Sequence, residues 1–343
     1  MRESTSSRGC PIDGTFTASR RRERGRAACS RVERSLHLSR GSRHRADGFD
    51  ARLVHLLGRQ DEGDAIRAIH AAIDKGVNWI DTAPFYGWGR AEEIVGRAVG
   101  DRRDRVLLFT KCGTMSDGAG GDFMDLSPAA IRGDVERSLR RLGTDRVDLL
   151  QLHDPDPRVP IEESWAEVQR LIEEGVVRHG GLSNHPVELI ERALAVGPVV
   201  SAQHRYNLFT RDIERDVLPF CREHGIAVLS WSSLGEGLLS DEFDLGSLEP
   251  DDFRRRSPNF QEPRYSRIRS LVAELARIAS EAGRSVSDLA IAWLLAQEGF
   301  TGTIVGVRTE EEARQLAEAA RWTASEDVLK KVDAAVVGFR EVG

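Results

Sequence analysis

The stretch that decides the fold reads Val77-Asn-Trp-Ile-Asp-Thr-Ala-Pro-Phe-Tyr-Gly-Trp-Gly-Arg-Ala-Glu-Glu93. Its first residues have the apolar character of a buried strand, which runs directly into a loop carrying Asp81 and, five residues later, Tyr86. Two later apolar segments also end on polar side chains, one on Lys111 and the other on His153. Because parallel strands of a barrel end at one face, we expect this carboxylate, phenol, ammonium and imidazole to meet in one site.

Strand-like and helix-like segments alternate from residue 64 onward. Isoleucines recur at helical spacing in Asp64–Lys75, and Ser127 with Pro128 forms a typical helix start that Gly143 matches with a typical stop. The patterns predict strands at 77–80, 106–110, 147–152, 176–182, 199–203, 226–231 and 303–307. They predict helices at 64–75, 91–99, 128–142, 161–174, 187–196, 212–223, 267–282, 286–297, 310–320 and 325–337.

Short aliphatic strands that are each followed by a helix indicate a parallel sheet with helices outside it. Seven such strands are clear, and an eighth would close a (β/α)₈ TIM barrel, an α/β fold. We therefore expect residues 51–343 to form one barrel domain with long active-site loops, in which the first strand is atypical or missing.

The N-terminal segment differs from the rest of the chain in composition. Residues 1–50 are rich in Ser, Arg and Gly, and they hold 12 arginines, no lysine and six acidic residues, so they carry a charge of +6. Without apolar periodicity such a segment is expected to be disordered. The total charge of −6 leaves −12 on residues 51–343, which argues against nucleic acid as a partner.

Two further features of the composition concern the compartment. There is no apolar run of membrane-spanning length, so no membrane partner is expected. The four cysteines, Cys10, Cys29, Cys112 and Cys221, are too few and too scattered for a disulfide framework or a zinc site. We interpret them as free thiols of a cytoplasmic protein, and we expect no metal.

The residues Asp81, Tyr86, Lys111 and His153, in that chain order, resemble the catalytic tetrad of the aldo-keto reductases. The resemblance runs from about Gly58 to the C-terminus and is nearest to the bacterial aryl-alcohol dehydrogenase-like branch. It implies an enzyme that reduces aldehydes or ketones to alcohols with NADPH, with Tyr86 as the general acid.

The residue types suit that chemistry. A free tyrosine has a pKa of about 10 and holds its proton tightly, and a neighbouring cation lowers that pKa. We therefore expect Lys111 to lower the pKa of Tyr86 and Asp81 to anchor Lys111 as an ion pair. His153 would orient the carbonyl group or relay the proton.

Further segments resemble the cofactor-binding positions of the family. Gly181-Leu-Ser-Asn184 implies that Ser183 and Asn184 hold the nicotinamide carboxamide. Ser201-Ala-Gln-His-Arg-Tyr-Asn207 implies that Gln203 reaches the same carboxamide and that Tyr206 stacks on the nicotinamide ring.

Two more segments resemble the parts that hold the phosphates. In Trp231-Ser-Ser-Leu-Gly-Glu-Gly-Leu238, the residues Ser232, Leu234 and Gly237 would wrap the pyrophosphate, and Ser233 stands where proline is usual, which is expected to loosen the loop. In 304–312, the residues Arg308, Thr309 and Glu312 would hold the adenosine end, and Arg308 with Thr309 favours NADPH over NADH.

The adenosine corner departs from the family pattern. Glu312 replaces a common glutamine and adds negative charge near the expected phosphate, and Leu316 replaces a common asparagine. The alternative interpretation of Arg308 is a solvated arginine at a helix start. The aromatic residues Phe85, Trp88 and Trp231 are expected to line the substrate pocket.

Other noticeable residues receive simpler interpretations. His179, His185 and His204 lack a carboxylate at ligand spacing and are expected to be polar residues at the rim rather than metal ligands. Gly118-Ala-Gly-Gly121 lacks the spacing of a dinucleotide fingerprint and is expected to be a mobile loop over the site.

The first barrel strand is where the resemblance breaks off. In the family it ends in a segment of the type Gly-Leu-Gly-Thr-Trp, and nothing similar precedes Asp64. Residues 51–57 are the only substitute. A reading-frame or start-site error, a divergent extension in which 51–57 form the strand, and a targeting peptide all remain open, although six acidic residues and the lack of an apolar segment disfavour the last.

Two other functional classes also remain open. One is a cofactor-binding sensor without catalysis, similar to potassium-channel β subunits, which the complete tetrad disfavours. The other is a metal-dependent barrel hydrolase using His153 and Asp154, which the lack of a His-x-His motif disfavours. The sequence does not predict the substrate, the direction of the reaction or the choice between monomer and homo-oligomer.

Overall fold

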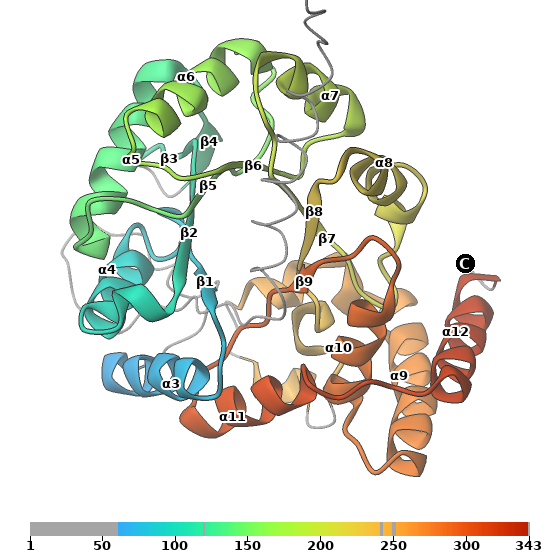
Figure 1. The fold of residues 1–343 in the computed structure, drawn as a ribbon. Helices are drawn as coiled ribbons and strands as arrows, with labels where there is room; N and C mark the ends of the chain where they lie inside the picture. The colour runs from blue at the N-terminus through green and yellow to red at the C-terminus, as the bar shows by residue number, and fades with distance from the viewer. Residues whose placement is uncertain (1–60, 119–120, 241–242, 249–251, 342–343) are drawn as a thin grey trace, which may run out of the picture.

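The structure, a computed structural model, describes residues 61–118, 121–240, 243–248 and 252–341. Its centre is a parallel sheet whose seven strands follow the order β1-β2-β5-β6-β7-β8-β9. The strands are β1 (Trp79–Asp81), β2 (Leu107–Cys112), β5 (Leu149–Leu152), β6 (Gly180–Ser183), β7 (Ser201–Arg205), β8 (Ala227–Trp231) and β9 (Gly302–Thr303). The sheet curls and helices surround it, so the predicted α/β barrel architecture is confirmed (Figure 1).

The helices follow the predicted pattern with shifted ends, the largest in the helix predicted at 212–223, whose first residues form a separate 3₁₀ helix, Asp212–Glu214. They are α3 (Glu62–Asp74), α4 (Arg90–Val99), α5 (Pro128–Leu142), α6 (Ile161–Glu173), α7 (Val187–Val196), α8 (Val217–His224), α9 (Arg264–Glu281), α10 (Val286–Ala296), α11 (Glu310–Ala319) and α12 (Glu326–Glu341). The Ser127 side chain caps α5 by accepting from the Ala130 N–H, and Gly143 ends it with a left-handed backbone. No helix among these is long and apolar enough to cross a membrane.

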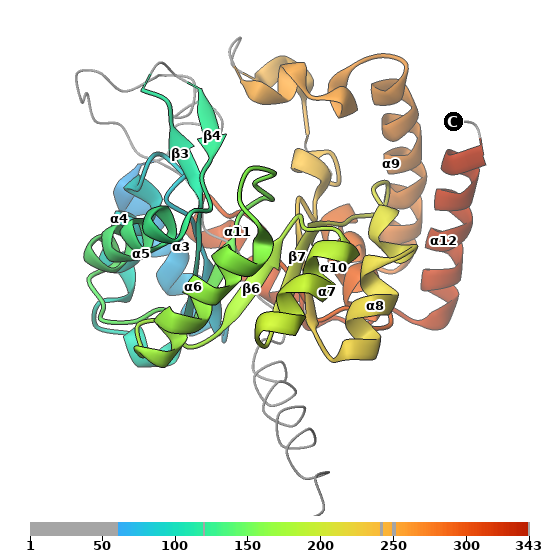
Figure 2. The same cartoon turned by 90° about the horizontal axis from the view of Figure 1, so that it is seen from above.

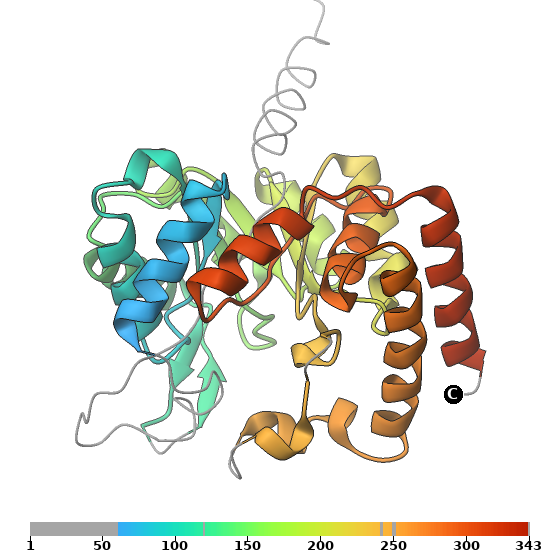
Figure 3. The ribbon, with the colours of Figure 1, turned by 90° about the horizontal axis from the view of Figure 1, so that it is seen from below.

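The two ends of the described sheet are β1 and β9. The segment 51–57, predicted to supply the remaining strand, lies outside the described residues, as does the predicted disordered segment 1–50. On the outside of the sheet, α3 packs directly against α11, so the layer of helices continues from the last strand to the first (Figure 3).

Two segments rise on the side of the barrel where the strands end (Figure 2). One is an antiparallel hairpin of β3 (Thr114–Ser116) and β4 (Asp122–Met124), which directly follows β2. Gly118 and Gly121 of the glycine-rich segment lie between β3 and β4, and residues 119–120 lie outside the described ranges, so the predicted mobility of this segment stays a prediction. The other segment lies between β8 and α9, and its described residues form the short 3₁₀ helices Gly235–Gly237, Leu245–Ser247, Phe253–Arg256 and Pro258–Phe260.

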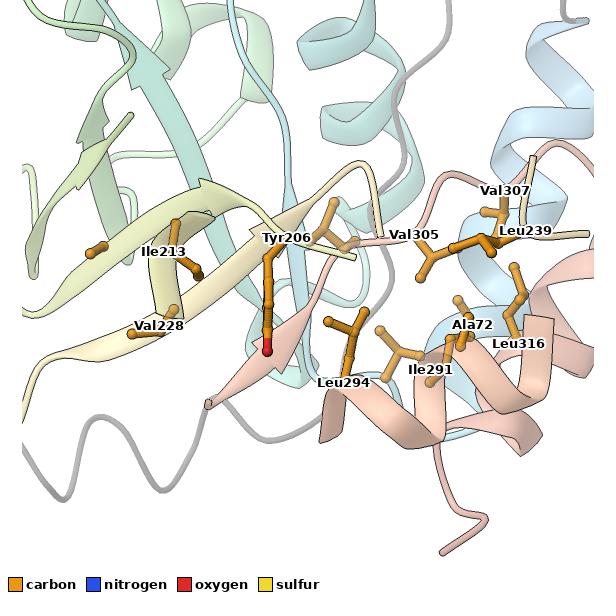
Figure 4. Close-up of a cluster of buried hydrophobic side chains, with 14 of the residues drawn as sticks. Ala72, Tyr206, Ile213, Val228, Leu239, Ile291, Leu294, Val305, Val307 and Leu316 are labelled. Carbon is orange, nitrogen blue, oxygen red and sulfur yellow. The ribbon is translucent and has the colours of Figure 1, made fainter. Parts of the chain in front are cut away.

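The apolar core has two parts. The larger fills the space between the sheet and the helices, and Figure 4 shows the portion beneath β8, α10 and α11. The smaller lies within the sheet and consists of Trp79, Phe109, Leu149, Leu229 and Ile304. The rings of Trp79 and Phe109 stack with centroids 4.7 Å apart. This inner cluster is the apolar floor beneath the strand ends, and three of its residues, Trp79, Phe109 and Leu149, each stand two places before a polar residue, namely Asp81, Lys111 and Gln151.

Two histidines predicted to lie at the rim are buried in the core instead. His185 is fully buried and His204 is 7% exposed. His204 is flanked on β7 by the inward-facing Gln203, so strand alternation turns it toward the helices. The Nε2 atoms of both histidines are buried and have no hydrogen-bond partner in the part of the chain that the structure describes. Burial lowers the pKa of each imidazole from 6.5 to about 4, so both are neutral near pH 7.

This burial predicts acid sensitivity. The folded-state pKa lies below the unfolded value, so each histidine destabilises the fold as pH falls from about 6.5 toward 4, by about 2–3 kcal/mol at pH 4.5. His204→Leu should reduce the loss of unfolding free energy between pH 7 and pH 4.5, measured by urea denaturation. His224→Gln, at an exposed position, serves as control. Equal pH slopes in all three proteins would contradict the prediction.

Candidate active site

The predicted tetrad residues Asp81, Tyr86, Lys111 and His153 come together at the strand ends. Lys111 and Asp81 are 1% and 0% exposed and form an ion pair. The Lys111 ammonium group also donates to the Thr82 carbonyl oxygen at 3.2 Å and to the Tyr86 hydroxyl oxygen at 3.2 Å. These three contacts account for the three protons of an ammonium group, so Lys111 has a fixed orientation.

Two glutamines complete the surroundings of the ion pair. Gln151 and Gln203 each donate through Nε2 to Asp81 Oδ2 at 2.9 Å, and Gln203 Nε2 lies 3.2 Å from Gln151 Oε1. A buried carboxylate needs several hydrogen bonds in addition to its counter-ion, and these amides supply them. Gly181, on the strand between the two glutamines, has no side chain there, and a Cβ atom would contact Ser201 Oγ.

Tyr86 is held by a tight loop after β1. Gly87, Trp88 and Gly89 all have positive φ angles, and a Cβ atom on Gly89 would collide with the Arg141 guanidinium group. Burial raises the pKa of the Tyr86 phenol, the Lys111 charge lowers it, and the net shift is upward. Lys111 thus lowers the pKa of Tyr86 as expected, but the burial of the phenol outweighs the charge of its neighbour.

Lys111 stays protonated in the same surroundings. Burial lowers the pKa of its ammonium group, but Asp81 and Tyr86 raise it by more, and the net shift is upward. Near neutral pH the arrangement is therefore an ammonium donor beside a neutral phenol. Since the phenol oxygen accepts from Lys111, the phenol proton is directed elsewhere.

His153 directly follows β5, and its Nδ1 lies 3.2 Å from Thr114 Oγ1 on the hairpin. Its ring meets the Tyr86 ring edge to face, with centroids 6.0 Å apart. The predicted pocket residues Phe85 and Trp88 lie beside it: the Phe85 ring is 5.9 Å from that of His153 and 5.4 Å from that of Trp88. The Tyr86 phenol and the His153 imidazole thus lie beside the aromatic rings of Phe85 and Trp88.

The predicted carboxamide-binding residues lie on neighbouring strand ends. Ser183 ends β6 and is 1% exposed, and Asn184 follows with a φ of 60°. Asn184 Oδ1 accepts from Trp231 Nε1 at 2.9 Å, and Asn184 Nδ2 donates to Asp154 Oδ1 at 2.8 Å. These two contacts fix the amide orientation. The third predicted pocket residue, Trp231, therefore lies beside Asn184.

Tyr206 does not lie where the resemblance implied. It is completely buried in the core outside the sheet, where its hydroxyl group donates to Glu214 at 2.7 Å and its ring lies 5.6 Å from that of Trp293 (Figure 4). A ring enclosed in this way has no face for a nicotinamide, so the stacking assignment is corrected. The aromatic ring near Asn184 is that of Trp231, with the Arg205 guanidinium carbon 5.2 Å from its centroid.

The segment predicted to wrap a pyrophosphate, 231–238, forms a tight loop. Ser232, Glu236 and Gly237 have positive φ angles of 55°, 62° and 98°, and Leu234 packs against the core. Ser233 does not loosen this loop as expected, because its buried hydroxyl group donates to the Ile304 carbonyl oxygen at 2.9 Å. The loop is thereby tied to the segment after β9.

One atom of this loop fits a bound phosphate. Ser232 Oγ is buried and has no hydrogen-bond partner among the described residues. A buried hydroxyl without a partner is costly, and a phosphate oxygen is an acceptor that it could donate to. The residues present therefore fit the pyrophosphate of a dinucleotide.

The predicted adenosine corner lies at the N-terminus of α11. Thr309 caps this helix by accepting from the Glu312 N–H at 3.1 Å, and Glu312 Oε2 accepts from the Arg308 N–H at 2.6 Å. The Arg308 side chain is exposed and lies 3.6 Å from the Glu312 carboxylate. Arg308 thus already faces a carboxylate where a 2′-phosphate was predicted to bind.

Several residues of the site were missed by the sequence reasoning. Gln151 and Thr114 hold Asp81 and His153, and Arg205 forms an ion pair with Glu236. Gln151 could have been found, because it precedes His153 by two residues and strand alternation places both on the inner face. Arg205 could have been found in the same way from Gln203, whereas Thr114 carried no signal apart from its position near a strand end. Among the described residues, no group of three His, Cys, Asp or Glu side chains could hold a metal ion.

A parallel α/β barrel with a buried Lys–Asp pair, a phenol and an imidazole at its strand ends defines a class of barrel oxidoreductases. The model of the Aldo/keto reductase family matches residues 51–337. The aldo-keto reductase YhdN of Bacillus subtilis is 39% identical over 283 residues, which cover 81% of this chain and 85% of that protein.

Solved structures agree with this. The glycerol dehydrogenase AKR11B4 from Gluconobacter oxydans superposes with a TM-score of 0.76 at 34% identity, covering 86% of this chain and 95% of that one. An aldo/keto reductase from Klebsiella pneumoniae in complex with NADP and acetate has a TM-score of 0.64 at 27% identity, covering 88% and 89%. The chain belongs to the aldo/keto reductase family and is an oxidoreductase.

The buried ion pair predicts a non-additive effect on stability. Lys111→Met leaves Asp81 as an uncompensated buried carboxylate and should lower the unfolding free energy by about 3–5 kcal/mol. The double variant Asp81→Asn, Lys111→Met should recover much of this loss, because no charge remains buried. Urea denaturation of the four proteins of this cycle measures the coupling. Additive losses would show that the two side chains do not stabilise each other.

Proposed function

We propose that the protein reduces aldehydes and ketones to alcohols with NADPH and that Tyr86 is the general acid. The observation that carries the proposal is the orientation of Lys111. Its protons are directed to Asp81, to the Thr82 carbonyl oxygen and to the Tyr86 hydroxyl oxygen. With its oxygen accepting from Lys111, Tyr86 is left to donate its own proton to a substrate oxygen.

Each side chain of the site has its own role in the proposed reduction. A bound reduced nicotinamide supplies the hydride that the carbonyl carbon takes up. Tyr86 gives its proton to the carbonyl oxygen as negative charge develops there, and the Lys111 ammonium group stabilises the phenolate that is left. His153, held by Thr114, orients the carbonyl oxygen beside Tyr86. Asp81 with its two glutamines keeps Lys111 charged and in place.

The groove for the cofactor would run from Asn184 and Trp231 past Ser232 to Arg308. Asn184 has a fixed amide orientation, so its oxygen and nitrogen present defined acceptor and donor positions to a carboxamide. Trp231 would take the stacking role first assigned to Tyr206. Ser183 and Gln203 complete the inner wall at the nicotinamide end, and the 231–238 loop with Ser232, Leu234 and Gly237 holds the pyrophosphate.

The first test concerns the acid. Tyr86→Phe removes the proton and keeps the ring, so kcat for carbonyl reduction should fall by about 10²–10⁴ while the Kd for NADPH changes little. Stopped-flow measurement of NADPH oxidation with an aromatic aldehyde gives the first quantity, and fluorescence titration gives the second. Wild-type turnover in Tyr86→Phe would exclude this role. If the unaltered protein binds NADPH and reduces no carbonyl compound, the sensor alternative is favoured.

The second test concerns the cofactor preference. Arg308→Ala should erode a preference for NADPH over NADH at least tenfold, since a charge-assisted hydrogen bond is worth about 1.5–3 kcal/mol. Glu312→Gln should strengthen NADPH binding several-fold and leave NADH unchanged, because it removes the carboxylate that faces Arg308. Titrations of both cofactors into the three proteins measure these values. Equal affinity of the unaltered protein for NADPH and NADH would refute the role of Arg308.

A further inference from the structure

A second carboxylate, Asp154, lies beside the proposed site, and the mechanism above gives it no role beyond orienting the Asn184 amide. It directly follows His153 at the end of β5. Its Oδ1 accepts from Asn184 Nδ2 at 2.8 Å, and the same amide nitrogen lies 3.3 Å from the His153 carbonyl oxygen. Asp154 is therefore joined through Asn184 to Trp231, one of the predicted pocket residues.

Asp154 differs from the fully buried carboxylates of the described residues in its lack of a cation. Within the described ranges, it has no lysine, arginine or histidine at ion-pair distance. The buried carboxylates elsewhere have such a partner, as in the pairs Asp81–Lys111, Glu92–Arg141, Asp148–Arg103, Glu167–Arg132, Asp156–Arg158 and Glu236–Arg205. A partly buried carboxylate without a counter-ion is costly to fold around, so a ligand that compensates it is a physical reason for its presence.

The charge of Asp154 reaches the reacting groups. Burial raises the pKa of the Asp154 carboxyl group, and both the hydrogen bond from Asn184 and the charge of Lys111 lower it in part. In turn, Asp154 contributes to the raised pKa of Tyr86. A charged substituent near a bound carbonyl group would experience the same field.

We propose that Asp154 is a specificity-determining residue that favours carbonyl substrates with a positively charged or hydroxyl substituent and disfavours those with a carboxylate. This rests on the proposed reductase function. An ammonium or hydroxyl group gives Asp154 a donor, and a carboxylate meets an uncompensated like charge. At a separation of about 6 Å and an effective dielectric constant of about 20, two unit charges interact strongly enough to change selectivity about tenfold or more.

The experiment uses pairs of aldehydes that match in shape and differ in charge. The anionic pair is 4-carboxybenzaldehyde with 4-nitrobenzaldehyde, and the cationic pair is betaine aldehyde with 3,3-dimethylbutanal. Asp154→Asn keeps the oxygen that accepts from Asn184 and removes the charge. Asp154→Ser is the second variant, and Asp145→Asn, an exposed carboxylate before the start of β5 and thus at the opposite end of that strand, is the control.

The measured quantity is kcat/KM for each aldehyde, expressed as the ratio of charged to neutral partner. In Asp154→Asn the anionic ratio should rise about tenfold and the cationic ratio should fall by a similar factor, and Asp145→Asn should change neither more than about twofold. If Asp154→Asn alters all four aldehydes equally, or alters only the Kd for NADPH, Asp154 merely positions Asn184 and the inference is wrong.

The neutral aldehydes separate this inference from the proposed function. Reduction of 4-nitrobenzaldehyde by the unaltered protein tests the reductase activity alone, and the charge ratios test Asp154. Activity on the neutral aldehydes with unchanged ratios in both Asp154 variants would overturn the role of Asp154 and leave the reductase function standing. No activity on any of the aldehydes would remove the function on which the inference rests.

Discussion

The ion pair between Lys111 and Asp81 is the interaction on which the rest of the site depends. Either charge would be strongly destabilising if it were buried alone. The groups that hydrogen-bond to the pair must therefore be in place whenever the protein is folded. Asp81, Lys111, Gln151 and Gln203 come from β1, β2, β5 and β7, and they meet only because the sheet curls. The curled sheet therefore brings Lys111 and Asp81 together. The ion pair in turn orients the Lys111 ammonium group so that one of its protons is donated to the Tyr86 hydroxyl oxygen.

The apolar floor explains why this part of the site could be predicted from the sequence. Trp79, Phe109 and Leu149 each precede by two residues the inward polar groups Asp81, Lys111 and Gln151. Side chains alternate along a strand, so an apolar residue that packs inside fixes the direction of the residue two places on. The helices, the parallel order and the tetrad all follow from patterns of this local kind.

The sequence reasoning failed where the answer depended on three-dimensional surroundings. Tyr206 was assigned by its resemblance to a motif, yet alternation from the inward Gln203 predicts that Arg205 faces inward and that Tyr206 faces the helices. The pKa of Tyr86 depends on how much water surrounds the phenol, which no motif encodes. Ser233 replaces a usual proline, and its effect depends on the Ile304 carbonyl oxygen, 71 residues away in the chain.

The adenosine corner shows a conflict between helix stability and phosphate binding. Acidic residues in the first turn stabilise a helix through its dipole, and α11 begins with Glu310, Glu311 and Glu312. The N–H groups that would meet a phosphate already donate to Thr309 and Glu312. Helix α11 also packs against α3, beside β1 and β9, the two end strands of the described sheet. A firmly capped α11 therefore stabilises the barrel at this place. A phosphate bound to Arg308 must therefore displace the Glu312 carboxylate without destabilising α11.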